Sequence, residues 1–179
     1  MLSRIRASAL AILAAIALAL PAQAARTPQL IDQNGHAFTF QTLRGTPLVV
    51  TFIAAHCTQA CPLVNAQFAQ AAQHFAQAHL HVRLLTITLD PEHDSLRDMH
   101  EIAQRFGADP RTWIVAGGKK ADVHSVMSAF GVTAERGRKG YADVHTTFVY
   151  FIDARGKLRK TILASTALGE QIIGQVSAR

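Results

Sequence analysis

The chain has 179 residues, which is enough for one ordinary domain. Hydrophobic residues make up 49% of it, and the formal net charge at pH 7 is +6, a mild basic excess spread along the sequence. Such diffuse charge argues against nucleic-acid binding and suits an acidic protein partner or an anionic membrane surface.

The N-terminal segment 1–24 has the layout of a secretory signal peptide. Two arginines form a basic start, an unbroken apolar run covers 9–20, and a small-x-small cleavage site ends at Ala24. As a helix, this run spans only about 18 Å, against about 30 Å for the hydrocarbon core of a membrane. We therefore predict export to the periplasm, cleavage after Ala24 and one mature domain over 25–179. Retention of the segment as a membrane anchor is the alternative.

The remaining sequence alternates short apolar runs with amphipathic segments. Asp32–Gly35 is a turn signal between two short strand-like pieces, and Leu48–Ile53 is an apolar, β-branched run typical of a buried strand. Further strands are expected at 81–89, 113–115, 146–152 and 157–162, with a hairpin turn at 153–156.

Apolar residues recur every three to four positions in four segments, which predicts amphipathic helices. The first helix follows directly after the cysteine segment. In the second, over 95–106, we expect Leu96 to face the core and Asp94 or Ser95 to cap the N-terminus. The third and fourth helices are expected at 120–130 and 168–176.

The order of these elements predicts an α/β fold. A strand that runs into a cysteine-bearing helix, and a late β-hairpin followed by a helix, are typical of a thioredoxin-like sandwich. We expect a central mixed sheet flanked by helices.

Cys57 and Cys61, the only cysteines, lie between the first buried strand and the first helix. A disulfide across so short a loop removes little entropy from the unfolded chain, so redox or metal chemistry is favoured over a structural staple. In a regular helix their Cβ atoms would lie about 5–6 Å apart, wider than the roughly 4 Å of a disulfide. The helix N-terminus should also lower a thiol pKa. This spacing favours two thiolates on one metal ion and leaves a reversible redox pair possible.

His145 is the third candidate ligand. It stands just before a predicted strand, where thioredoxin-like thiol reductases have a cis-proline that faces the cysteines. Two cysteine sulfurs and one histidine nitrogen suit Cu(I), Cu(II) or Zn(II). A polar residue at a strand start, without a metal, is the alternative for His145.

Other residues near these segments have competing interpretations. His56 is a residue without a role in the site, a spare ligand or a proton source beside the thiolates, and His93 lies in a loop that follows the second buried strand. The basic loop with Arg136, Arg138 and Lys139 either docks an acidic surface or is simply solvated.

Three segments together resemble the SCO/SenC family of copper-binding cytochrome c oxidase assembly proteins. They are the cysteine segment Ala54–Pro62, LTITLDPEHDS over 85–95 and DVHTTFVYFID over 143–153, within a match that covers roughly 28–179. The family usually has a proline and often an acidic residue after the first cysteine, where this chain has Thr58 and Gln59.

The resemblance implies copper on Cys57, Cys61 and His145. It also implies delivery of that copper to the binuclear copper site of cytochrome c oxidase subunit II, or reduction of that site's cysteines to thiols. The expected partners are subunit II or another copper-accepting protein and a thiol reductant, close to a membrane and without nucleic acid.

Two other functions stay open at this point. One is a thiol-disulfide oxidoreductase or a peroxiredoxin-like antioxidant protein, in which Cys57 attacks and Cys61 resolves. The other is a copper sensor or buffer that transfers its metal to no oxidase.

Overall fold

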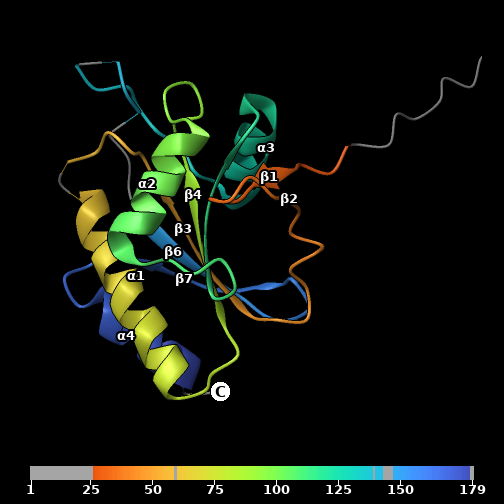
Figure 1. Ribbon diagram of the computed structural model, residues 1–179, viewed down its shortest axis with the longest axis vertical. Coiled ribbons are helices and arrows are strands. Elements are labelled where there is room, and N and C mark those ends of the chain that lie inside the picture. The colour runs from red at the N-terminus through yellow and green to blue at the C-terminus, as the bar shows by residue number, and fades with distance from the viewer. Residues whose placement is uncertain (1–25, 59, 139, 143–146, 178–179) are drawn as a thin grey trace, which may run out of the picture.

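A mixed β-sheet forms the centre of the computed structural model, which describes residues 26–58, 60–138, 140–142 and 147–177 (Figure 1). Within these residues the strand order is β2-β1-β5-β4-β3-β6-β7. The strands are β1 Leu30–Ile31, β2 Ala37–Phe38, β3 Leu48–Ile53, β4 Arg83–Thr88, β5 Trp113–Gly118, β6 Phe148–Ile152 and β7 Leu158–Leu163. The helices are α1 Ala60–Gln77, α2 Leu96–Phe106, α3 Lys120–Phe130 and α4 Leu168–Ser177.

Strand β3 lies at the middle of the sheet's apolar part. It pairs in parallel with β4 and antiparallel with β6, so that Val50 stands opposite Leu85 on one side and Tyr150 on the other. All six residues of β3 are buried. Burial of both faces explains why this strand is a continuous apolar run instead of an alternating one.

Helices cover both faces of the sheet. On one face Phe68 of α1, Met99 of α2 and Ile172 of α4 share a core with Trp113, whose indole Nε1 donates to Thr86 Oγ1 at 3.0 Å. On the other face α3 packs through three buried residues, Val123, Val126 and Met127. Figure 1 shows α3 apart from the other three helices.

The predicted order of elements is confirmed, and one prediction of side-chain position, for Leu96, needs correction. Leu96 is 40% exposed, whereas α2 buries Met99, Ile102 and Ala103. Leu96 lies in the first turn of α2, over Gly117 at the end of β5, where the sheet covers only part of its side chain. Of the two residues predicted as the cap of α2, Asp94 or Ser95, the structure has Ser95.

Within the described residues, none of the helices has both the length and the apolar content of a membrane span. The predicted signal peptide over 1–24 lies outside the described residues and stays a prediction.

Candidate metal centre

The two cysteines lie at the carboxyl end of β3. After Ile53 the chain makes a turn in which the Cys57 backbone N–H donates to Ala54 O at 3.2 Å, and α1 begins at Ala60. Cys57 therefore precedes the helix, and Cys61 lies in its first turn. The Cβ spacing of a regular helix therefore does not apply to this pair, because Cys57 lies before the helix. The turn instead brings the Cys57 side chain within hydrogen-bonding distance of Cys61.

The two sulfurs differ in exposure and in acidity. Cys57 is partly exposed, whereas Cys61 is 2% exposed. The hydrogen bond with Cys57 raises the pKa of the Cys61 thiol, and burial raises it further. The lowered pKa expected at a helix N-terminus is therefore wrong for Cys61. A buried thiol such as Cys61 loses its proton readily when a metal cation compensates the negative charge of the thiolate.

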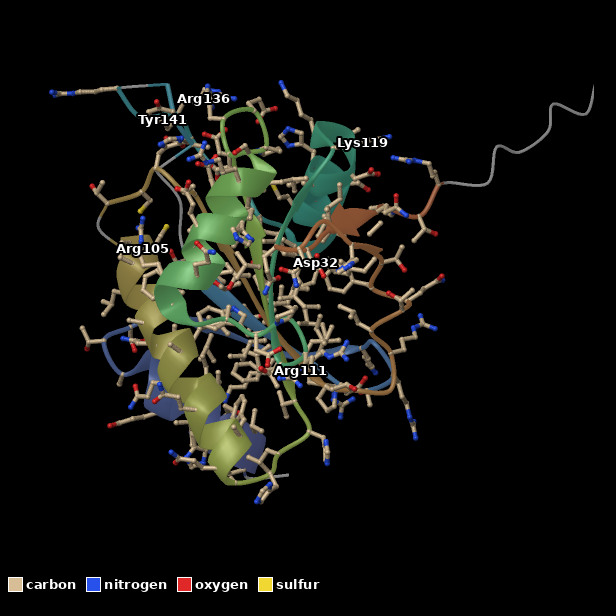
Figure 2. All side chains as sticks on the ribbon, in the orientation of Figure 1. Asp32, Arg105, Arg111, Lys119, Arg136 and Tyr141 are labelled. Atoms are coloured by element: carbon tan, nitrogen blue, oxygen red, sulfur yellow. The ribbon has the colours of Figure 1, made fainter. Side chains whose placement is uncertain are left out.

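A small cavity lies behind the sulfurs, between α1 and α2. Its volume is about 20 Å³, and Cys57, Cys61, Asn65 and Arg105 are among the residues that line it. This is room for about a single water molecule, so the cavity itself cannot hold a larger group. Figure 2 shows Arg105 beside the first turn of α1, which places a cationic side chain near the two thiols.

Asp94 anchors the chain just before the cysteines. Its Oδ2 accepts from the Ala55 N–H at 2.9 Å and from Thr88 Oγ1 at 2.6 Å. These bonds tie the cysteine segment to the end of β4. Burial raises the pKa of the Asp94 carboxyl, against the effect of the Thr88 hydrogen bond.

A second anchor, Asp90, holds the loop that leads toward His145. Asp90 is fully buried, and its Oδ2 accepts from the Ala142 N–H at 2.8 Å. His93 Nδ1 lies 3.0 Å from both carboxylate oxygens, and Arg136 Nη1 lies 3.7 Å from Oδ1.

His145 lies outside the described residues, together with its neighbours over 143–146. The described chain resumes beside β3, where Thr51 Oγ1 donates to the Phe148 carbonyl at 3.1 Å. Because β3 and β4 are parallel and β6 is antiparallel to β3, Ala142 and Phe148 both lie at the end of the sheet that carries the cysteines.

His56 and His93 are both found next to Tyr141, a residue that the sequence analysis did not select. The His56 and Tyr141 rings stack with centroids 4.2 Å apart, and the His93 ring meets Tyr141 edge-on at 5.1 Å. No spacing rule connects these positions, since the contact depends on how two distant loops meet.

Arg136 binds groups within its own molecule, so its guanidinium is already engaged and not free to dock a partner. Its Nη1 donates to the Gly140 carbonyl at 2.7 Å, and its Nη2 lies 3.7 Å from Glu92 Oε2. Figure 2 shows Arg136 and Tyr141 together at this end of the molecule. Arg138 is exposed, and Lys139 lies outside the described residues. The hypothesis that this basic loop docks an acidic surface therefore rests on these two residues and not on Arg136.

In the part of the chain that the structure describes, no three His, Cys, Asp or Glu side chains converge as a ligand set for a metal ion. Among the described residues the candidate metal ligands are therefore the sulfurs of Cys57 and Cys61, and thiolate sulfur suits a soft metal ion.

The SCO1/SenC family model matches residues 19–178, nearly the whole chain. The chain belongs to the SCO1/SenC family.

Individual SCO1/SenC relatives are distant in sequence. The SCO2-like protein of Rickettsia typhi is 28% identical over 138 residues, which are 74% of this chain and 66% of that protein. The SCO1 protein homolog of Bacillus subtilis is 19% identical over 131 residues, 72% of this chain and 68% of the homolog. The chain spans just under two thirds of the length of the rickettsial relative.

Solved SCO1/SenC structures confirm the thioredoxin-like fold. The family lipoprotein of Bacillus anthracis has a TM-score of 0.74 and 25% identity, covering 86% of this chain and 92% of that one. ScoI of Bradyrhizobium japonicum, solved with copper bound, has a TM-score of 0.73 and 24% identity, covering 86% and 97%.

Proposed function

We propose that this protein binds copper through Cys57, Cys61 and His145 and serves in the assembly of cytochrome c oxidase. The observation that carries the proposal is the pair of hydrogen-bonded cysteine side chains at the carboxyl edge of β3. Relatives support it, because ScoI of Bradyrhizobium japonicum and yeast Sco1 were solved with copper bound. A further structural relative, BsSco, is described as a member of the Sco family of cytochrome c oxidase assembly proteins.

The chemistry of the pair suits copper held for transfer. Thiolates are soft ligands that select Cu(I), and both thiols release their protons when the metal binds. Cys57 is partly exposed, so an incoming partner thiolate can reach the metal side of the pair and exchange ligands.

The same pair can reduce a disulfide in the partner. Cys57 thiolate attacks one partner sulfur, Cys61 then attacks Cys57, and the partner leaves with two thiols while this protein gains one disulfide. A thiol reductant is then needed to restore the pair. This step supports a second proposed role, reduction of a disulfide between the cysteines of the binuclear copper site to the two thiols that bind copper.

His145 is proposed as the third ligand from the position of its flanks. Ala142 is bonded to Asp90 and Phe148 is bonded to Thr51, both at the cysteine end of the sheet. Only five residues separate these two anchors, a stretch too short to carry His145 far from that end.

Copper titration of the reduced chain over 25–179 tests the proposal, with a chromophoric Cu(I) chelator as competitor. We expect one Cu(I) per chain, a loss of affinity of at least about 100-fold in Cys57→Ser or Cys61→Ser, and at least about tenfold in His145→Ala. The control is His36→Ala, because His36 is exposed and contacts only Asp32 among the described residues. Unchanged affinity in either cysteine variant would refute copper binding at this pair.

Export to the periplasm is part of the proposal. We expect the N-terminal sequence of the protein isolated from its host to begin at Ala25. A start at Met1 in a membrane fraction would instead indicate the retained anchor.

A second function, thiol-disulfide oxidoreductase or peroxiredoxin-like antioxidant activity, is favoured by one observation. A partly exposed Cys57 beside a buried Cys61 is the arrangement of an attacking and a resolving thiol. Turnover of a disulfide or peroxide by metal-free protein, equal in the wild type and in His145→Ala, would support this function over copper binding.

A further inference from the structure

The Tyr141 ring lies between two imidazoles that come from two different loops. His56 directly precedes Cys57, and its ring stacks on Tyr141 with an interplanar angle of 22°. His93 comes from the loop after β4 and meets the same ring at 81°. One aromatic side chain therefore links the cysteine loop and the loop after β4 to its own loop, which follows α3.

The loop that carries Tyr141 is itself fixed by polar contacts. The adjacent Ala142 N–H is bonded to the buried Asp90, and Arg136 holds the Gly140 carbonyl on the other side of Tyr141. The Tyr141 ring is thus presented to His56 by an anchored backbone. Its stacking restrains the residue next to Cys57 from outside the cysteine loop.

We propose that Tyr141 is a positioning residue for the copper site, acting through His56 on Cys57; this rests on the proposed function. Because the His56 ring is pinned, the Cys57 backbone samples fewer conformations before the metal arrives. Less conformational entropy is then lost when copper binds. The ring and not the hydroxyl does this, since within the described residues the Tyr141 hydroxyl makes no hydrogen bond.

The expected change in Cu(I) affinity can be estimated from the strength of the stacking between His56 and Tyr141. An aromatic pair of this kind changes an equilibrium by about two- to tenfold. Tyr141→Ala should weaken Cu(I) binding by this factor and shift the visible and EPR spectra of the Cu(II) form. Tyr141→Phe, which keeps the ring, should stay within about twofold of the wild type. After His56→Ala, adding Tyr141→Ala should cost little more, because the two rings act as one unit.

The experiment measures Cu(I) affinity and Cu(II) spectra for these variants and, in metal-free protein, amide hydrogen exchange over 54–58. We expect faster exchange there in Tyr141→Ala but not in Tyr141→Phe. The matched control is Phe40→Ala, which removes another half-buried ring, one that contacts Phe130 on the α3 side of the sheet. It should leave both exchange over 54–58 and the Cu(II) spectra unchanged.

The outcomes separate this inference from the proposed function. Wild-type affinity and spectra in Tyr141→Ala would overturn the role of Tyr141, as would an equal effect in Phe40→Ala. If the wild type bound no copper, the proposed function would fail. Exchange over 54–58 would then decide alone whether Tyr141 restrains the cysteine loop.

Discussion

The carboxylate of Asp94 holds the cysteine segment in place, but burial disfavours its ionised form. It accepts hydrogen bonds from Ala55 and Thr88, yet burial outweighs them and raises its pKa above the ordinary value of 3.8. The folded protein therefore binds a proton at Asp94 more tightly than the unfolded chain does. Its contribution to stability is fully present below the unfolded pKa and is lost as pH rises through the folded pKa.

Asp94→Asn should remove this dependence. The carboxamide oxygen still accepts both bonds, so the free energy of unfolding of the variant, minus that of the wild type, should rise with pH through the window just above 3.8. Urea unfolding from about pH 3.5 to about pH 7 measures it. Asp109→Asn is the control of opposite sign, because the hydrogen bond from Arg111 lowers the pKa of Asp109. A constant difference for Asp94→Asn would contradict the account.

The N-terminus of α2 is an element-scale feature that supports the same region. Ser95 Oγ accepts from the Asp98 N–H at 3.2 Å, and Asp98 Oδ2 accepts from the Ser95 N–H at 2.7 Å, which together form a capping box. Because Ser95 directly follows Asp94, this cap also restrains the backbone of Asp94 and so the position of its carboxylate.

Ser95→Ala should lower the free energy of unfolding by about 1 kcal/mol. Urea denaturation of the metal-free protein gives the value. Ser125→Ala is a matched control, since Ser125 is an exposed position in the interior of α3 and makes no cap. The control should stay within about 0.5 kcal/mol of the wild type. An equally small change in Ser95→Ala would mean that the cap does not stabilise α2.

Helices and strands were predictable where the spacing of apolar residues along the chain matched the faces that are buried in the fold. Strand β3 and helix α3 match their predicted bounds, because a β-branched run and a regular apolar spacing left no competing structure. Leu96 shows the limit of this reasoning. Periodicity assigns it to the inner face of α2, but the end of the sheet at Gly117 covers only part of the Leu96 side chain.

The candidate site was predictable only in part. Cys57 and Cys61 were found from their position between a strand and a helix, but their geometry was not, because the turn before α1 depends on hydrogen bonds to Ala54 and Asp94. The contact of His56 with Tyr141 was out of reach, since nothing local in either segment indicates it.

At the scale of the whole molecule, the sheet topology gathers the site from separate parts of the sequence. The parallel pair β3 and β4 delivers the cysteine loop and the Asp90 loop to one edge. Strand β6, which is antiparallel to β3, begins at that same edge. The fold therefore brings both flanks of the segment that contains His145 to the cysteine end of the sheet, which supports the proposed three-ligand copper site.

X-ray absorption spectroscopy of the reduced, Cu(I)-loaded chain over 25–179 tests this claim most directly. The account predicts copper with two sulfur neighbours and one nitrogen neighbour, and loss of the nitrogen neighbour in His145→Ala while both sulfurs remain. A copper environment that is the same with and without His145, or one that contains no sulfur, would contradict it.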